Sequence, residues 1–384
     1  MNEAIERVAV LREGAAQWCD PGSAVRRRAR AALEGGEWPP QVVEATLDRV
    51  LRDADAALDA VPEQTSPLTV LAILPGNILG PAIATAYCAA AVGADLMLKS
   101  SSRELHLADI VAEQFKTLGP PVVGTLRPMR WSGGDTDFEA KVFPLAQRIV
   151  AFGDDETIAD IKRRAPQGVD VVGYGSAYSL GFVPAAFDVA SAAQAAAQDV
   201  ALFDQRGCLS PQTIYVEGDE ARCILFAHAL AACLERVGRE LPRAVALEGE
   251  RAAVVEFVRR LQVRALPAAT HALGTIIQGR ARDGVPEYVV GAEPFGGPVC
   301  AGFGRIVVVK PCTNAAQAAS AAATLGRRLD SVGVATHADA PLSTGLHVVF
   351  SEAGALRVCK LGELQQPPLG YRPRIRDFIG VTRT

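Results

Sequence analysis

The residue whose type and setting point most directly to chemistry is Cys208, in the stretch DQRGCLSPQ. An alanine-rich apolar segment precedes it and the apolar run TIYVE follows it, which places it at a helix-to-strand corner. Gly207 would let a substrate approach the backbone there, and Arg206 would favour a nearby thiolate. Cys88 and Cys233 lie inside alanine-rich helical segments and are expected to be buried and inert. Cys208 is therefore the candidate nucleophile.

Three polar loops follow predicted buried strands, and each opens a helix: LPGNILGP, LKSSSRE and FGDDET. Because the carboxyl ends of parallel strands meet at one edge of a sheet, function is expected where these loops cluster. Asn77, Lys99 and Gly153 are the candidate residues in them. The acidic residues after Gly153 also suit an ordinary helix N-cap, and that alternative stays open. The sequence has neither a glycine-rich dinucleotide fingerprint nor a P-loop.

The elements that position these loops alternate between strands and helices. The first sixty residues have helical spacing, with Val42, Leu47 and Leu51 among the apolar positions. From Leu68 onward, buried strands alternate with helices, which is typical of a parallel α/β domain. A second series follows, with strands expected at LGFVP, TIYVE and RIVVV and near residues 332, 347 and 356. We predict domains at 1–178 and 179–360, followed by a tail at 361–384.

Composition excludes several classes of protein. A chain of 384 residues with a net charge of -4 and a pI near 5.8 has no basic surface for nucleic acid, and the run Arg26–Arg28 is interpreted as a solvated helix face. Eight cysteines without CxxC pairs predict no metal site and a reducing compartment. The longest apolar run, 82–94, is too short to span a bilayer. We expect a soluble, cytoplasmic protein without membrane insertion.

Several motifs, taken in order, resemble the aldehyde dehydrogenase superfamily: PGN, a strand-ending lysine followed by serines, FGDDETI, QRGC and EPFGGPV. DQRGCLSPQ and the tail RVCKLGELQQPPLGYR are similar to the LuxC-type acyl-CoA reductases of that superfamily. The resemblance extends over roughly 68–372. It implies an aldehyde-dehydrogenase-like α/β fold, in which a Rossmann-like cofactor domain joins a catalytic domain and each is a three-layer α/β structure.

The resemblance also implies roles for single residues. Cys208 would be the nucleophile, and the Asn77 amide with the Cys208 backbone N–H would form an oxyanion hole. Glu293 would bind the nicotinamide ribose with Phe295 beside the ring, and Gly153 would lie behind the cofactor's pyrophosphate.

At the adenosine end, Lys99 would hold the ribose. Ser102 stands where a glutamate often reads the ribose hydroxyls, and without that carboxylate Lys99 or Arg103 could pair with a 2′-phosphate. NADPH is therefore predicted as the cofactor, with NADH as the alternative.

One departure from the superfamily decides the expected reaction. Hydrolytic aldehyde dehydrogenases carry a glutamate at the start of the segment VVGYGSAYS, whereas this chain has Val171, Val172 and Gly173 there. Without that base, attack of water on an acyl-enzyme is slow, so reduction of an acyl thioester is favoured. The histidine associated with the luminescence reductases is also absent, which leaves local electrostatics, Tyr174 or Tyr178 to activate the thiol.

The predicted function is NADPH-dependent reduction of an acyl-CoA or acyl-carrier-protein thioester to an aldehyde. The alternatives are a CoA-acylating or hydrolytic aldehyde dehydrogenase and a non-catalytic or acyl-transfer subunit. We also expect a homodimer or higher homo-oligomer, because the terminal stretch RDFIGVTRT reads as an edge strand that would pair across an interface.

Overall fold

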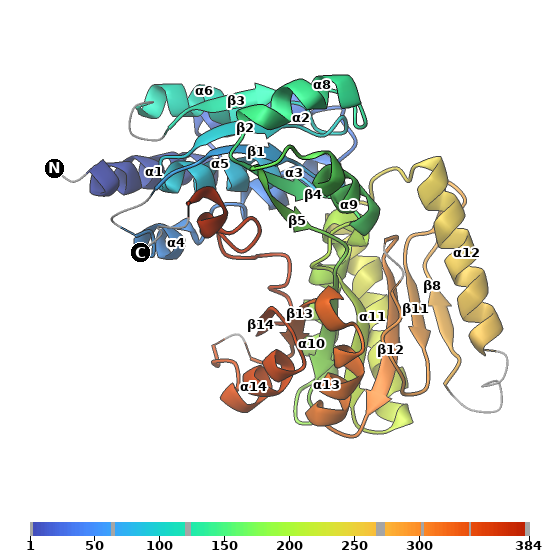
Figure 1. Ribbon diagram of the computed structural model, residues 1–384. Helices are drawn as coiled ribbons and strands as arrows, with labels where there is room; N and C mark the ends of the chain where they lie inside the picture. Colours follow the sequence, from blue (N-terminus) through green and yellow to red (C-terminus); the bar gives the residue numbers. More distant parts are fainter. Residues whose placement is uncertain are drawn as a thin grey trace. The chain divides into compact units, whose positions relative to one another are not determined.

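The chain divides into two compact units (Figure 1). The computed structural model describes residues 3–62, 66–119, 124–265, 273–300, 303–337 and 339–380. Unit 1 comprises Met1–Ser176 together with Gln366–Thr384, and unit 2 comprises Ala177–Gln365. The division lies close to the predicted boundary between residues 178 and 179. Most of the predicted tail, from Gln366 onward, belongs to unit 1.

Unit 1 is built on a five-stranded sheet in the order β3-β2-β1-β4-β5, and every adjacent pair is parallel. The chain builds outward from β1 to β3 and then places β4 on the other side of β1. The strand order therefore reverses between β1 and β4, which is the switch point where parallel α/β sheets bind ligands. The strands are β1 (Thr69–Ile73), β2 (Asp95–Lys99), β3 (Leu126–Met129), β4 (Arg148–Phe152) and β5 (Asp170–Tyr174).

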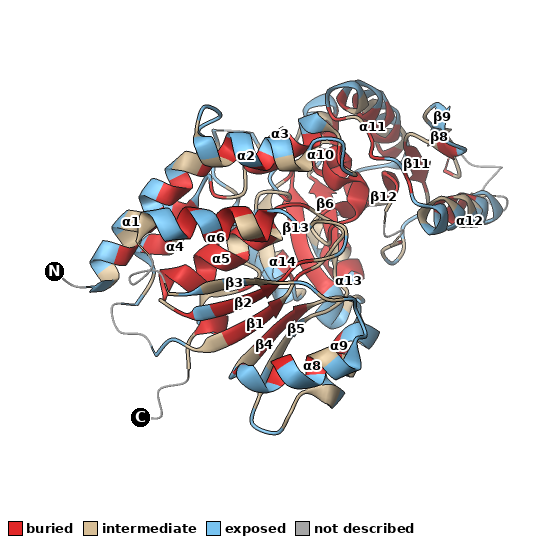
Figure 2. Ribbon diagram, turned by 90° about the horizontal axis from the view of Figure 1, so that it is seen from above, coloured by how far each residue is buried: buried red, intermediate tan, exposed pale blue. Residues whose placement is uncertain are grey.

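The centre of this sheet is buried on both faces. Residues 70–72 of β1 and 149–151 of β4 are continuous apolar runs with almost no exposed surface, as expected where helices cover a parallel sheet (Figure 2). The helices of unit 1 are α1 (Glu3–Cys19), α2 (Ala24–Leu33), α3 (Pro40–Leu47), α4 (Ala54–Asp59), α5 (Pro81–Ala91), α6 (Leu107–Leu118), α8 (Thr136–Val142) and α9 (Asp155–Arg164), with the 3-10 turns η1 (Phe143–Leu145) and η5 (Ile375–Phe378). Strand β3 and helix α8 were not predicted.

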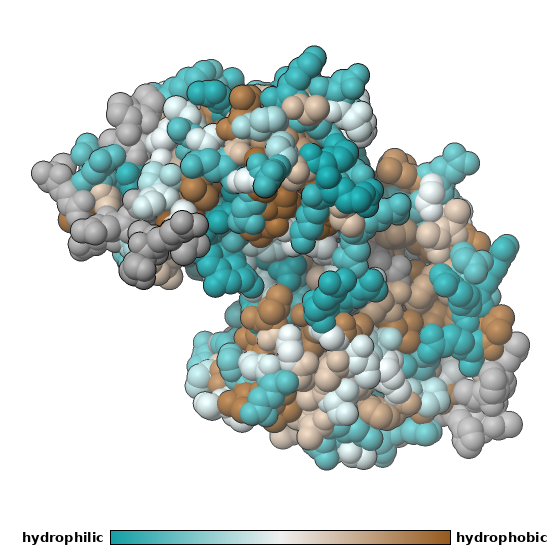
Figure 3. All heavy atoms as spheres, in the orientation of Figure 1, coloured by the Kyte–Doolittle hydropathy of each residue, from teal (hydrophilic) through white to brown (hydrophobic). Residues whose placement is uncertain are grey.

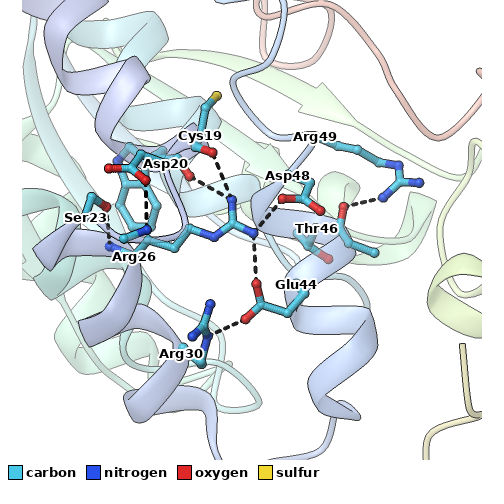
Figure 4. Close-up of polar contacts among 12 residues, drawn as sticks. Cys19, Asp20, Ser23, Arg26, Arg30, Glu44, Thr46, Asp48 and Arg49 are labelled. Carbon is cyan, nitrogen blue, oxygen red and sulfur yellow. Dashed lines mark hydrogen bonds and ion pairs between the residues drawn. The ribbon is translucent and has the colours of Figure 1, made fainter. Parts of the chain in front are cut away.

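A buried arginine holds the N-terminal helices together, which corrects the prediction of a solvated arginine run. Arg26 of α2 is 1% exposed, and its guanidinium lies 2.9 Å from a Glu44 carboxylate oxygen and 2.5 Å from one of Asp48 (Figure 4). It also donates to the carbonyls of Trp18 and Cys19 at the end of α1. The other two arginines of the run are exposed, as predicted. One arginine therefore joins α1, α2 and α3.

The C-terminal segment closes against its own chain. Residues 375–378 form the turn η5, Ile379 bridges Pro67 in antiparallel fashion, and the Leu68 amide donates to the Phe378 carbonyl. The predicted strand is therefore wrong for the described part of RDFIGVTRT, whose last four residues lie outside the described residues. The backbone of Pro67 and Leu68 is therefore paired with the C-terminal segment of the same chain.

Unit 2 contains a seven-stranded mixed sheet in the order β14-β13-β6-β7-β12-β11-β8, in which β8 alone runs antiparallel to its neighbour. Its strands are β6 (Tyr178–Val183), β7 (Pro211–Glu217), β8 (Ile276–Gln278), β11 (Val289–Ala292), β12 (Ile306–Cys312), β13 (Leu329–Val334) and β14 (Arg357–Lys360), beside the hairpin of β9 (Ala281–Arg282) and β10 (Val285–Pro286). Its helices are α10 (Val189–Ala201), α11 (Glu220–Glu240), α12 (Glu248–Ala265), α13 (Ala315–Ala323) and α14 (Thr344–Glu352), with the 3-10 turns η2 (Leu202–Gln205) and η4 (Gly326–Arg328).

Most of the second predicted series is observed, with one error of type. The strand expected near residue 347 is the helix α14. Leu346, Val349 and Phe350 pack into the core that includes Phe182, at spacings of three and four residues that suit a helix. The run LHVVF is short and partly β-branched, and periodicity alone does not separate a helix from a strand at that length.

The surface alternates between hydrophilic and hydrophobic residues on the face shown in Figure 3. Large exposed apolar side chains are distributed over both units, including Ile5 and Leu145 in unit 1 and Leu225 and Val263 in unit 2. Within the described ranges, no helix has both the length and the apolar character needed to cross a bilayer.

Candidate active site

Cys208 lies in unit 2 on a corner with an unusual backbone. It is half-buried and lies between η2 and β7, just before the amino end of β7. Three consecutive non-glycine residues, Phe203, Asp204 and Gln205, have φ values of 60°, 52° and 60°. Left-handed backbone costs roughly 1–2 kcal/mol for each ordinary residue. The surroundings must therefore stabilise the turn by several kcal/mol.

A buried ion pair supplies part of that stabilisation. Asp204 Oδ1 accepts a hydrogen bond from Arg305 Nε at 2.7 Å, and Arg305 Nη2 lies at the same distance. Asp204 Oδ2 accepts from the Ala244 amide at 2.9 Å, while its carbonyl accepts from the Gly304 amide at 2.8 Å. Arg305 itself has a φ of 54° and donates to the Leu241 carbonyl. Asp204 thus ties the turn to the segments before α12 and before β12.

Gln205 and Arg206 anchor the turn in the same way. The Gln205 amide nitrogen donates to the carbonyls of Pro211 and Ile306 at 3.0 and 2.9 Å, and its oxygen accepts from the Ile306 amide. Arg206 is buried, and its Nη2 lies 2.8 Å from a Glu250 carboxylate oxygen. This pairing offsets the positive charge that was predicted to favour the thiolate. The side chains of Asp204, Gln205 and Arg206 therefore hold the backbone of the corner in place.

The tail motif contacts the loop that follows the cysteine. Gln365 donates to the Ser210 hydroxyl and to the Asp199 carbonyl, and the Gly362 amide donates to an Asp199 carboxylate oxygen at 2.6 Å. Asp199 lies on α10 and is 1% exposed, and burial raises its pKa to about 7. On the opposite side of the loop, Ser179 Oγ donates to the Cys208 carbonyl at 2.8 Å. The sequence similarity in the tail thus has a structural counterpart at the corner.

The two tyrosines proposed as activators differ in their settings. Tyr174 ends β5 in unit 1, donates to an Asp377 carboxylate oxygen and accepts from the Arg374 amide. Burial, followed by the hydrogen bond to Asp377, raises the pKa of Tyr174 above its usual range, so the phenolate that could accept the thiol proton is scarce near neutral pH. Tyr178 begins β6 immediately before Ser179, and its role stays a prediction.

In unit 1, the structure gathers three predicted residues at one sheet edge. Asn77, Lys99 and Gly153 lie at or just beyond the carboxyl ends of β1, β2 and β4, beside the switch point. The loops after β1 and β2 are in contact, because a Cβ on Gly76 would lie 2.1 Å from Ser101 Oγ. Lys99 is largely buried, its ammonium lies 5.7 Å from the centroid of a Trp131 ring, and burial lowers its pKa.

The corner after β4 is built as a helix cap. Asp154 Oδ1 accepts from the Thr157 amide at 2.7 Å, and these hydrogen bonds lower the pKa of Asp154. Asp155 accepts from the Ser176 amide, and Glu156 adds a third acid to the start of α9. A Cβ on Gly153 would lie 3.0 Å from the Thr157 side chain, so this glycine permits the close turn. The N-cap interpretation is confirmed, and this helix end suits a pyrophosphate poorly.

Glu293 and Phe295 lie in the loop between β11 and β12 of unit 2. Glu293 follows the carboxyl end of β11, where its amide donates to the Val309 carbonyl and its Oε2 lies 3.3 Å from Lys310 Nζ. The last residue of the EPFGGPV motif, Val299, exchanges hydrogen bonds with Thr213 Oγ1 of β7 at 2.8 and 2.9 Å, five residues after Cys208. The roles of Glu293 at the nicotinamide ribose and of Phe295 beside the ring stay predictions.

The residues after β2 fit the adenosine end of a nicotinamide dinucleotide. Ser102 and Arg103 follow Lys99 directly, so this edge carries hydroxyl and cationic donors for ribose and phosphate oxygens. Sequence reasoning missed Glu37, whose carboxylate pairs with Arg103. Within the part of the chain that the structure describes, no group of three or more histidine, cysteine or acidic side chains is arranged to hold a metal ion.

Solved aldehyde dehydrogenases share this architecture. A putative aldehyde dehydrogenase from Burkholderia cenocepacia matches 96% of this chain and 80% of its own with a TM-score of 0.71 at 15% identity. A NAD-dependent benzaldehyde dehydrogenase from Corynebacterium glutamicum matches 99% of this chain and 84% of its own with a TM-score of 0.68 at 16% identity. The chain therefore has an aldehyde-dehydrogenase-like α/β fold, as predicted.

The family follows from the sequence match. The model of the acyl-CoA reductase (LuxC) family matches residues 44–371, so the chain belongs to that family, and the predicted resemblance is confirmed. A long-chain acyl-protein thioester reductase from Aliivibrio fischeri is 27% identical over 200 residues, 51% of this chain and 40% of that protein. One from Photorhabdus laumondii is 29% identical over 177 residues, 45% and 36% respectively. The chain thus spans about two fifths of the length of these relatives.

Proposed function

We propose that this protein reduces an acyl thioester, carried by coenzyme A or by an acyl carrier protein, to an aldehyde through an acyl group bound to Cys208. The observation that carries the proposal is the strained turn before Cys208, which three buried polar side chains hold in place. A structure that costs several kcal/mol is typical of a functional site. Membership of the acyl-CoA reductase family and the names of the two relatives support the same reaction.

The chemistry begins when the Cys208 thiolate attacks the carbonyl carbon of the thioester. The carbon–sulfur bond to the carrier breaks, the carrier thiolate leaves and takes a proton, and the acyl group stays on Cys208. A reduced nicotinamide cofactor, when bound, supplies the hydride that reduces the acyl group. The bond from carbon to Cys208 then breaks, which releases the aldehyde and restores the thiolate. We propose the Asn77 amide and the Cys208 N–H as the donors to the oxyanion.

The cofactor is proposed to bind at the carboxyl edge of the unit 1 sheet, with Lys99 and Ser102 at the adenosine ribose. NADPH is the proposed cofactor and NADH the alternative, because Ser102 brings no negative charge toward a 2′-phosphate. The proposal also keeps Gly153 behind the pyrophosphate, Glu293 at the nicotinamide ribose and Phe295 beside the ring, as the family resemblance implies.

Hydrolysis of the acyl-enzyme is disfavoured by the composition of β5. Val171, Val172 and Gly173 occupy the part of this strand where a hydrolytic enzyme would carry its glutamate base, and no carboxylate stands among them. Water attack on the thioester lacks that general base, so the acyl group persists long enough to be reduced.

The test compares Cys208→Ala with Cys19→Ala, which removes an exposed thiol of α1. Each variant is mixed with a saturated acyl-CoA and NADPH while nicotinamide absorbance, free thiol and aldehyde are followed together. We expect Cys208→Ala to lose all three signals and Cys19→Ala to retain them. Turnover that survives in Cys208→Ala would refute the acyl-enzyme.

A second reaction separates reduction from hydrolysis. The protein is given an aldehyde and NADP⁺ with or without coenzyme A, and the products are separated by mass. Acyl-CoA formed only when coenzyme A is present supports thioester chemistry, whereas free acid formed without it would favour a hydrolytic enzyme. Light scattering of the same preparation tests the predicted homo-oligomer.

A further inference from the structure

Arg103, in the loop after β2, forms an ion pair with Glu37, a residue from a distant part of the unit 1 sequence. Arg103 stands four residues after Lys99, the last residue of β2. Its Nε donates to Glu37 Oε2 at 2.9 Å, and its Nη2 donates to Glu37 Oε1. The two parallel hydrogen bonds form the fork by which arginine binds a carboxylate or a phosphate.

The location of this pair gives it a functional meaning. In doubly wound sheets, the end of the second strand reads the adenosine ribose, where an acid binds a 2′-hydroxyl and an arginine accommodates a 2′-phosphate. Arg103 lies over that edge, because its Cδ is 3.4 Å from the position of a Cβ on Gly76, in the loop after β1. Glu37 reaches it from the connection between α2 and α3, 66 residues away in sequence.

We infer that Glu37 is a specificity residue which competes with a 2′-phosphate for Arg103, and so reduces the preference for NADPH over NADH that Ser102 alone would give. The side chains are 17% and 29% exposed, so a ligand can reach the pair while part of its charge remains shielded from water. A 2′-phosphate must displace Glu37 or lie beside its negative charge, whereas a 2′-hydroxyl can donate to the same carboxylate. This inference rests on the proposed cofactor site.

The experiment measures dissociation constants of NADPH and NADH by calorimetry, without acyl substrate, for the unchanged protein and for Glu37→Gln. We expect the affinity for NADPH to rise about tenfold, the low end of the range for a hydrogen bond to a charged group, because the pair is partly exposed. The NADH affinity should not rise, since the 2′-hydroxyl exchanges a carboxylate acceptor for a neutral amide oxygen. Glu113→Gln is the matched control, because it removes one negative charge from an exposed pair with Arg28 and Lys116 in the same unit.

A second variant keeps the inference testable if Glu37→Gln fails to fold. Arg103→Gln should weaken NADPH binding while NADH binding changes little, because only the phosphate loses a partner. A ratio of the two affinities that stays within about twofold of the original in whichever variant folds would overturn the inference and leave the proposed function intact. If neither dinucleotide binds the unchanged protein, the proposed function is refuted, and this inference fails with it.

Discussion

The buried pair of Asp204 and Arg305 provides the sharpest test of how the cysteine corner is held. Asp204→Asn retains the shape of the side chain and a residue that tolerates left-handed backbone, but it leaves the Arg305 guanidinium buried without its counter-charge. Removing one partner of a buried pair costs about 3–5 kcal/mol. The two side chains are only 5% and 2% exposed, so the cost is not screened by water. Because Arg305 keeps its hydrogen bond to the Leu241 carbonyl, we expect a loss near 3 kcal/mol.

The two units offer separate signals for this measurement. All three tryptophans, at positions 18, 38 and 131, lie in unit 1, so their fluorescence in urea follows that unit. Unit 2 is followed by the labelling of Cys223, a thiol of α11 with no exposed surface, quantified by mass spectrometry of the peptide that carries it. We expect Asp204→Asn to lower the midpoint of thiol labelling more than that of tryptophan fluorescence.

A matched control variant separates the loss of the buried ion pair from the loss of any carboxylate of unit 2. Asp188→Asn also removes a carboxylate from unit 2, but from an exposed N-cap of α10 whose loss costs at most about 1 kcal/mol. The double variant Asp204→Asn with Arg305→Met removes the unpaired charge and should recover part of the loss. If Asp204→Asn costs no more than Asp188→Asn, the ion pair is not what stabilises the turn, and the reasoning is refuted.

Two further predictions concern titration and rate. Burial raises the pKa of Asp199 to about 7, so the folded state binds a proton that the unfolded state releases between about pH 4 and 7. This group's contribution to stability is therefore present below pH 4 and falls by up to about 1.4 kcal/mol per unit as pH rises to 7; Asp199→Asn should remove that slope in urea unfolding, and an unchanged slope would contradict the assignment. Asn77→Ala should lower kcat about 100- to 1000-fold with little change in KM, and a rate within tenfold of the original would exclude an oxyanion role.

Local pattern predicted the elements and edges that depend on nearby residues. The strands around 68–74, 95–100 and 148–153 were predicted because continuous apolar runs between polar loops are typical of a buried parallel sheet. The setting of Cys208 was predicted for the same reason, since a glycine and a proline interrupt two apolar segments there. The order of the strands, and with it the switch point beside Asn77, follows from long-range pairing that periodicity does not report.

The missed features of the cysteine corner depend on partners far along the chain. No propensity predicts left-handed backbone at Phe203, Asp204 and Gln205, because the residues that stabilise it include Arg305 and Ile306, 101 residues away. The available signal was the run of three polar residues between two buried apolar elements, which a compact fold accepts only if each one is paired.

The difference between the two halves of the predicted site follows from the same physics. The cysteine motif keeps its meaning because its own letters, Asp204, Gln205 and Arg206, hold the turn in place. The EPFGGPV motif is held by residues outside it: Tyr215 donates to the Gly296 carbonyl, and Lys310 pairs with Glu293. Val299, the last residue of the motif, exchanges hydrogen bonds with Thr213 near the amino end of β7, so the motif is anchored along the length of that strand. The sequence of EPFGGPV therefore predicts the loop but not its position, because the side chains that hold the loop, those of Thr213, Tyr215 and Lys310, belong to the neighbouring strands β7 and β12.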